Sequence, residues 1–210
     1  MYNPRHTRHP SCMHIYEARK FDIPALEGLS QKTIDAHIGL YEGYVKNFNT
    51  ISKQIAELAM TDSEKYAHAV SELVRRRGFE FDGMRLHEYY FEQFEGGASP
   101  LSEGGLLAAA FAQAYAPAGF PAVFKAIGSM RGPGWAILYY DPAGKELLTA
   151  FVEEHQLGHF AGLPIVLILD VWEHAFLLDF GTAGKGGYID AFFKNLNWGV
   201  VEKRFAAIRG

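Results

Sequence analysis

The sequence has little cysteine: Cys12 is the single one among 210 residues. One thiol excludes an intrachain disulfide, and it also excludes a metal cluster held by several thiolates. A metal site in this chain must therefore use imidazole, carboxylate or water ligands, which suit manganese, iron or zinc.

Long apolar runs and strong charge of one sign are also missing. No apolar run reaches the roughly 18 residues of a membrane-spanning helix, and the N-terminal stretch lacks the apolar core of a secretory signal. Charged residues are 21% of the chain and the net charge is −4, with one basic run at residues 75–77. We therefore expect a cytoplasmic protein that has no membrane segment and no nucleic-acid partner.

The N-terminal half carries the pattern of a helical hairpin. Ser30 is a suitable N-cap for a helix that starts at Gln31. The apolar face of this helix recurs at three- and four-residue spacing and consists of Ile34, His37, Tyr41, Tyr44, Phe48 and Ile51. A capping-box pattern at 61–64 predicts a second helix that ends at Arg77, with Gly78 after it. A further helix is expected over 84–94.

The C-terminal half has a mixed pattern, and it begins where Gly96-Gly97-Ala-Ser-Pro100 breaks the chain. Short strands are expected over 135–140, 147–152 and 165–169, and helices over 106–115, 121–127, 188–196 and 198–207. The predicted class is α+β. It consists of a flexible extension (1–20), a helical hairpin domain (21–95) and an α/β domain with a three-stranded antiparallel sheet (96–210).

The stretch 163–176, LPIVLILDVWEHAF, contains the most informative spacing. Its strand is apolar on both faces, which is typical of a fully buried strand, and it ends in Asp170. An unpaired buried carboxylate is very costly, so a metal ion would stabilise it, and His174 could reach the same ion. The alternative is an Asp held by backbone N–H groups beside an unrelated core histidine. Spacing alone leaves both open.

The string Asp170–Phe176 resembles the DxWxHA-aromatic motif of the iron/manganese superoxide dismutases. Residues 33–39 and 86–91 resemble the two helices that carry ligands in that family, and 188–198 is similar to its C-terminal DYxxxFWxxxNW pattern. Gly134-Trp135-Ala136 matches part of a further motif. The resemblance extends from about residue 21 to the C-terminus.

This resemblance implies one iron or manganese ion per subunit, which converts two superoxide ions to O₂ and hydrogen peroxide. The implied ligands are His37, His87, Asp170 and His174. Taken alone, His37 would be interpreted as a core histidine. The ion would cycle between its trivalent and divalent states, with a proton supplied through residues beside the ligands.

Four residues are candidates for that proton-handling role. Tyr44 resembles the family's tyrosine beside the ligands. Gly83 stands where one iron subgroup carries a glutamine, so the partner of metal-bound solvent is expected at His155, with Gln156 as the next candidate and His159 as the third. The ordinary alternatives are a core tyrosine and a solvated loop. Gly83 together with His155 favours iron over manganese.

Some positions depart from the family pattern. His37 and Tyr44 are seven residues apart instead of eight, which predicts a regular helix of two turns between them. Leu40 and Tyr41 replace paired histidines, and Leu177 replaces a tyrosine. These residues flank the family's substrate gate, the route by which superoxide reaches the metal.

Assembly follows from the same motif. In the family, the residue at Glu173 contacts the ligand histidine of a second subunit, so the resemblance implies a homodimer through Glu173 and His174, with a tetramer as a larger alternative.

The sequence is compatible with three functions. The first is superoxide dismutation, and the second is a non-catalytic metal-binding or structural homologue whose gate has changed. The third is a mononuclear iron oxygenase or zinc hydrolase that uses two His and one Asp. A fourth ligand at His37 favours the first over the third, whereas the altered gate favours the second.

Overall fold

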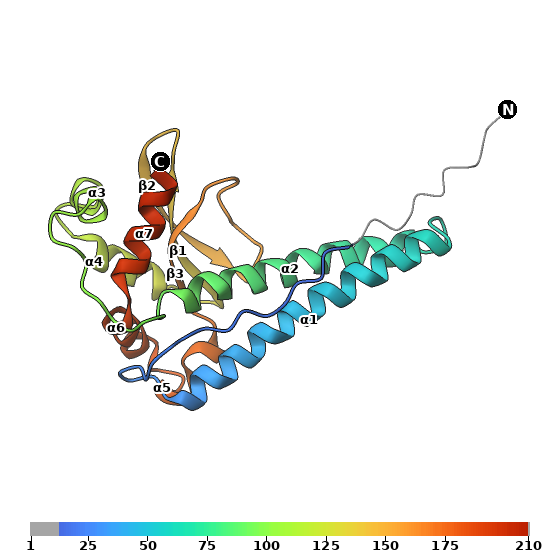
Figure 1. Cartoon of the computed structure of the whole chain (residues 1–210), viewed down its shortest axis with the longest axis horizontal. Helices are drawn as coiled ribbons and strands as arrows, with labels where there is room; N and C mark the ends of the chain where they lie inside the picture. The colour runs from blue at the N-terminus through green and yellow to red at the C-terminus, as the bar shows by residue number, and fades with distance from the viewer. Residues whose placement is uncertain (1–12, 210) are drawn as a thin grey trace.

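The structure, a computed structural model, describes residues 13–209. Cys12 and the first part of the predicted extension lie outside this range. The remaining part, residues 13–20, forms no helix or strand and lies along the helical hairpin (Figure 1). Tyr16 exchanges two hydrogen bonds with Asn49: its N–H donates to Oδ1 at 3.0 Å and its carbonyl accepts from Nδ2 at 2.8 Å. The segment just before residue 20 is thereby fastened to the hairpin.

Two long helices, α1 (Gln31–Thr61) and α2 (Ala67–Glu92), form that hairpin. The side chain of Ser30 accepts from the N–H of Thr33 at 3.2 Å, as expected of an N-cap. The buried side of α1 follows the predicted spacing and contains Ile34, His37, Tyr41 and Val45. The inner ends of both helices pack against the rest of the molecule, and their outer ends project away from it (Figure 1).

The predicted break at Gly78 is wrong, because α2 is one continuous helix through residues 67–92. The capping box at 61–64 is also wrong, since Thr61 is the last residue of α1. A glycine inside a helix costs only about 1 kcal/mol relative to alanine, and packing along α1 outweighs that cost. The arginines at 75–77 therefore lie within the helix, where Arg76 Nε donates to Glu80 Oε1 at 2.7 Å.

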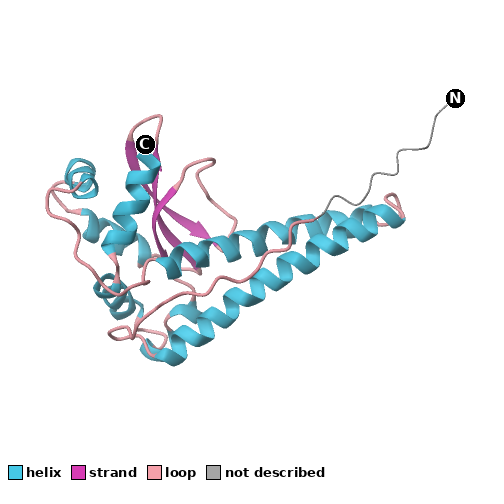
Figure 2. Ribbon diagram, viewed as in Figure 1, coloured by secondary structure: helices cyan, strands magenta, loops and turns pink. Residues whose placement is uncertain are grey.

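The C-terminal half contains a small sheet with short helices beside it (Figure 2). Its elements are α3 (Leu106–Tyr115), α4 (Phe120–Gly128), β1 (Gly134–Asp141), β2 (Glu146–Glu153), β3 (Ile165–Asp170), the 3₁₀ turn η1 (Glu173–Ala175), α5 (Leu177–Phe180), α6 (Lys185–Asn195) and α7 (Trp198–Arg209). The strand order is β2-β1-β3, and both pairings are antiparallel. The predicted α+β class and three-stranded sheet are confirmed.

The central strand β1 joins the two halves of the core. All of its residues except Asp141 are buried. Helix α2 and helix α7 pack on β3, whereas α3 packs on β2 and α4 packs on both β1 and β2. Across the predicted domain limit at 95/96, the N–H of Asn197 donates to the carbonyl of Gln93 at 2.8 Å. The limits of the two domains stay a prediction.

No helix within residues 13–209 is by itself long and apolar enough to cross a membrane. Helices α3 and α4 reach that apolar length only as a pair, and the pair is bent by 73°.

Candidate metal centre

The fold brings the four predicted ligands together from four different elements. His37 comes from α1, His87 from α2, Asp170 from the last position of β3, and His174 from η1. One nitrogen or oxygen atom from each lies within 4.8 Å of those of the other three. The apolar strand carries the Asp170 carboxylate to the point where the inner ends of the two long helices meet the sheet.

The three imidazoles converge on a single carboxylate oxygen. The Nε2 atoms of His37, His174 and His87 lie 3.1, 3.2 and 3.5 Å from Asp170 Oδ2. Asp170 and His87 are completely buried, His37 is 1% exposed, and the His174 side chain is 20% exposed. Only the His174 side of the cluster therefore approaches the surface.

The tautomer of His87 indicates that a cation belongs among these atoms. Its Nδ1 lies 2.6 Å from the carbonyl oxygen of Gly83, and because that oxygen can only accept, Nδ1 must carry the proton. Burial, together with the neighbouring His37, lowers the pKa of His87 well below its usual value, so the ring is neutral and Nε2 holds a lone pair. That lone pair faces Asp170 Oδ2 with no proton between them, and a metal ion would relieve this contact.

Asp170 remains ionised in spite of its burial. Burial acts to raise the pKa of its carboxyl group, but the charges and hydrogen bonds of His174 and His37 together hold that pKa well below its usual value. Its other oxygen, Oδ1, accepts from the N–H of Trp172 at 2.8 Å, which leaves Oδ2 directed at the imidazoles. A metal ion would take the place of the protons between these groups, and three imidazoles with one carboxylate are a donor set that fits iron or manganese.

Tyr44 and His155 form a hydrogen-bonded pair beside this cluster. His155 is fully buried, its Nε2 lies 2.8 Å from the Tyr44 hydroxyl, and its Nδ1 accepts from the indole N–H of Trp135 at 3.0 Å. Burial lowers the pKa of His155 to about 4. The neutral ring therefore carries its proton on Nε2 and donates it to the Tyr44 oxygen. The hydroxyl proton of Tyr44 is left free to point elsewhere.

Gly83 explains how Tyr44 reaches this position. The ring of Tyr44 lies 5.2 Å from the ring of His87, centroid to centroid. A Cβ atom at residue 83 would come within 2.8 Å of the Tyr44 ring, closer than packed carbon atoms approach. The space that a side chain at residue 83 would need is thus filled by Tyr44.

The other two predicted loop residues lie differently. Gln156 lines a surface cleft of about 210 Å³ together with Arg76 and Phe79, and within residues 13–209 no hydrogen bond joins it to the four ligand candidates. His159 Nε2 donates to the backbone carbonyl of His155 at 2.8 Å, and its Nδ1 accepts from a tyrosine hydroxyl. His159 thus supports the loop that carries His155.

The three residues that replace the family's gate residues differ in burial. Tyr41 is fully buried, donates to Glu88 Oε1 at 3.1 Å and accepts from the N–H of Arg19 at 2.7 Å. Leu40 and Leu177 are 42% and 41% exposed. The helix between His37 and Tyr44 is regular, as predicted.

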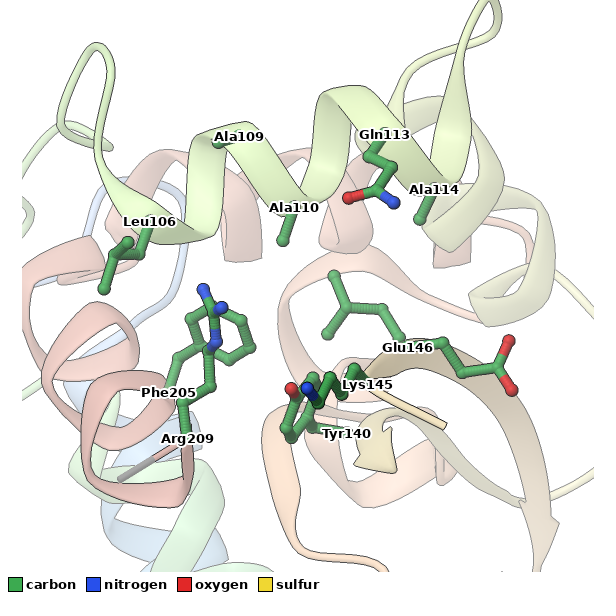
Figure 3. Close-up of a pocket in the computed structure, with 11 residues that line it drawn as sticks. Leu106, Ala109, Ala110, Gln113, Ala114, Tyr140, Lys145, Glu146, Phe205 and Arg209 are labelled. Carbon is green, nitrogen blue, oxygen red and sulfur yellow. The ribbon is translucent and has the colours of Figure 1, made fainter. Parts of the chain in front are cut away.

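A larger cavity lies at the opposite end of the sheet (Figure 3). It measures about 380 Å³ and lies between α3, α7 and the β1–β2 turn, with Ala110, Tyr140 and Phe205 among its lining residues. Tyr140 is five residues along β1 from Trp135, roughly 17 Å at the usual rise of a strand. None of the four ligand candidates lines this cavity, so cavity size alone would have pointed away from the cluster.

Tests of the sequence against known proteins agree with this geometry. A family model described as iron/manganese superoxide dismutases, C-terminal domain, matches residues 105–204. A protein of Saccharolobus solfataricus named superoxide dismutase (Fe) is 32% identical over 192 residues, which cover 88% of this chain and 89% of the relative. One of Cupriavidus metallidurans with the same name is 35% identical over 205 residues, covering 92% and 98%. A Haloarcula marismortui protein named superoxide dismutase (Mn) is 33% identical over 189 residues, covering 88% and 90%.

The fold and the donor set are those of an α+β protein built around a single-ion site. The likeness to these relatives extends over most of their length and most of this chain. This chain belongs to the iron/manganese superoxide dismutase family.

Sequence reasoning missed the partners of His155. Trp135 was noted as part of a motif without a role, and its bond to His155 spans twenty residues. The pairing of Arg76 with Glu80 was also missed, although a four-residue spacing of opposite charges on a helix is a usable signal.

Proposed function

We propose that this chain is a superoxide dismutase that binds one iron or manganese ion through His37, His87, Asp170 and His174. The observation that carries the proposal is the neutral His87 imidazole whose Nε2 lone pair faces the ionised Asp170 at 3.5 Å. A bound iron or manganese ion supplies the one-electron oxidation and reduction that dismutation requires. The names of the three relatives support the same activity.

Dismutation consumes two protons for each hydrogen peroxide that is formed, so the chain must hold protons beside the site. Burial, above all, raises the pKa of Tyr44 above its usual value, which keeps its hydroxyl protonated at neutral pH. Because His155 donates to the Tyr44 oxygen, the hydroxyl proton can point towards the reacting species. We assign proton delivery to Tyr44 and orientation of Tyr44 to His155, with Gln156 taking no direct part.

The walls of the site limit what can enter it. The ring of Trp135 packs edge-on against His87 at 5.0 Å, and Trp172 stacks on His174 at 5.9 Å. These indoles surround the ligands with apolar surface, which excludes water and strengthens the electrostatic interactions inside. A small anion such as superoxide fits a site of this kind, whereas a bulky substrate would have to displace a tryptophan.

The finer parts of the proposal concern metal and assembly. We favour iron, since Gly83 and His155 resemble iron-dependent members and the relatives from Saccharolobus and Cupriavidus carry iron in their names. The relative from Haloarcula carries manganese, so both metals belong in the test. We further propose a cytoplasmic homodimer through the exposed Glu173 and the adjacent His174, with a tetramer as a larger assembly, and neither a nucleic-acid nor a membrane partner.

Reconstitution with each metal tests this function. The chain is loaded separately with iron and with manganese, the bound metal is quantified, and superoxide consumption is measured. We expect one ion per chain and rapid turnover with at least one metal, and loss of both in His87→Ala.

One observation favours a second candidate, a metal-binding homologue without catalysis. Leu40 and Leu177 place exposed apolar side chains where the family has polar gate residues. Stoichiometric metal binding without superoxide turnover would establish this alternative and refute the dismutase proposal.

A further inference from the structure

Four residues of α2 form one row that leads from the surface to the candidate metal centre. Arg76, Glu80, Gly83 and His87 are spaced by four, three and four positions, so they lie on one face of the helix. Arg76 is exposed, Glu80 is buried, Gly83 provides space for the Tyr44 ring, and His87 belongs to the ligand cluster. Within this row, Arg76 and Glu80 have no role in the proposed function.

Glu80 is an unusual buried acid. It is 1% exposed, its Oε1 accepts from Arg76 Nε at 2.7 Å, and its Oε2 is buried without a hydrogen-bond partner among residues 13–209. A buried carboxylate that is only half satisfied opposes folding. Glu72 on the same helix offers a comparison, because it pairs with Arg75 at 3.3 Å while its side chain stays 55% exposed.

The pair of Arg76 and Glu80 fixes an aromatic ring. The Cζ atom of Arg76 lies 4.0 Å from the centroid of the Phe79 ring. Phe79 packs on the ring of His155 at 4.5 Å and on that of Tyr44 at 6.0 Å. Phe79 also lines the 210 Å³ surface cleft, which His155 does not line. The ring therefore lies between the cleft and the Tyr44–His155 pair.

We propose that Glu80 is a positioning residue of the dismutase site, an inference that rests on the proposed function. Its carboxylate holds the Arg76 guanidinium over Phe79, and Phe79 in turn presses on His155 and closes the cleft side of the site. The Tyr44–His155 hydrogen bond then keeps its geometry, and water from the cleft does not reach it. This role accounts for a buried acid whose second oxygen is unpaired, since a leucine would pack there at less cost.

The test removes each partner of the Arg76–Glu80 pair in turn, in the full-length, metal-loaded protein. Glu80→Leu removes the acceptor, Arg76→Met removes the guanidinium but keeps the stem, and Glu72→Leu is the matched control on the exposed pair. Three quantities are measured: bound metal per chain, kcat for superoxide, and the dissociation constant of azide from optical titration. Azide is a small anion that reports on the site without turnover.

We expect Glu80→Leu and Arg76→Met to keep one metal ion per chain. Each should lower kcat and raise the azide dissociation constant by about threefold or more, because water that enters past Phe79 screens the site. The double variant should be no worse than the poorer single variant, since both changes break the same contact. Glu72→Leu should stay within about 1.5-fold of the unchanged protein. Glu80→Gln keeps an acceptor oxygen and should recover most of the loss.

The proposal would be overturned if Glu80→Leu had the same kcat and azide dissociation constant as Glu72→Leu. It would also be overturned if Glu80→Gln were as impaired as Glu80→Leu. Strictly additive effects in the double variant would also contradict it. If Glu80→Leu does not fold, Arg76→Met decides, because it breaks the contact from the exposed side. An unchanged chain that binds metal and azide but consumes no superoxide would refute the proposed function instead, and the azide comparison would still test the positioning role.

Discussion

The outer and inner halves of α2 are parts of one helix with opposite environments. In the outer half, residues 67–78, no residue is fully buried, and most side chains are exposed. In the inner half, residues 79–92, eight are buried, His87 among them. Helix geometry is the same in both halves. The comparison shows that the site lies where the sheet and α1 enclose the helix, and that the outer half serves to extend the hairpin.

The largest difference between the two halves is expected when a histidine is replaced, in the effect on metal occupancy and superoxide turnover. His68 is exposed in the outer half, whereas His87 is fully buried among the other ligand candidates. His87→Ala should lower metal occupancy and superoxide turnover by more than a hundredfold, because it removes one of four ligands. His68→Ala should leave both unchanged. Bound metal and activity are measured together, and a metal-replete His87→Ala protein would contradict the ligand assignment.

Replacing each of the two interior glycines of α2 by alanine is expected to change the free energy of unfolding in opposite directions. A Cβ atom at Gly78 meets nothing within 4 Å, whereas at Gly83 it meets the Tyr44 ring at 2.8 Å. Gly78→Ala should therefore raise the free energy of unfolding by up to about 1 kcal/mol, through better helix propensity. Gly83→Ala should lower it by about 1–3 kcal/mol through overpacking, and should also lower turnover as Tyr44 shifts.

Denaturant unfolding of the two glycine variants, run side by side, checks this prediction. A destabilised Gly78→Ala would mean that the helix is not regular there. An undisturbed Gly83→Ala would mean that Tyr44 does not fill that space.

Two tyrosines of α1 lie against the inner half of α2 and are expected to differ in function. Tyr41 bonds to Glu88 and to the backbone of Arg19, whereas Tyr44 bonds to His155. Each Phe substitution should lower the free energy of unfolding by about 1 kcal/mol, since it leaves buried partners unpaired. Only Tyr44→Phe should reduce kcat, by roughly tenfold. Equal kcat values in the two variants would remove Tyr44 from proton delivery.

The smallest effect is expected at the exposed ion pair of the outer half. Arg75 pairs with Glu72 at 3.3 Å, and both side chains are more than half exposed. Arg75→Ala should change the free energy of unfolding by less than about 0.5 kcal/mol, because solvent and salt screen such pairs. Its thermal unfolding is compared with that of the unchanged chain at low and high salt, and a larger effect at low salt would mark the outer half as more than an extension.

Elements and candidate ligands that are marked by short-range sequence patterns could be predicted from the sequence. The apolar strand that ends in Asp170, the four-residue step to His174 and the periodic face that contains His37 all depend on short-range patterns, and the structure brings these residues to one place. The three strands and helices α3, α4, α6 and α7 also follow from local alternation and from turn residues, whereas the short η1 and α5 were not predicted.

The continuity of α2 was not predictable from the same kind of signal. Gly78 and the arginines before it match a helix end, and each such local preference amounts to about 1 kcal/mol or less. The contacts that α2 makes with α1 on both sides of Gly78 sum to more than that. Tertiary packing therefore overrides the local end signal, and a single sequence does not display tertiary packing.

The environment of His155 was not predictable for a related reason. Its partners are Tyr44, more than a hundred residues earlier, and Trp135 on the neighbouring strand. Only the closed fold joins these three residues. The choice between His155 and Gln156 thus had no local basis, whereas in the structure one is buried beside the ligands and the other lines a surface cleft.

The inner end of the hairpin and the end of β3 together are proposed to bind one redox metal ion. Anomalous X-ray diffraction at the iron or manganese absorption edge, on crystals of the loaded protein, would locate that ion. We expect a single strong peak per chain, within bonding distance of the Nε2 atoms of His37, His87 and His174 and of Asp170 Oδ2. A principal peak elsewhere, or one that is bonded to fewer than these four side chains, would contradict it.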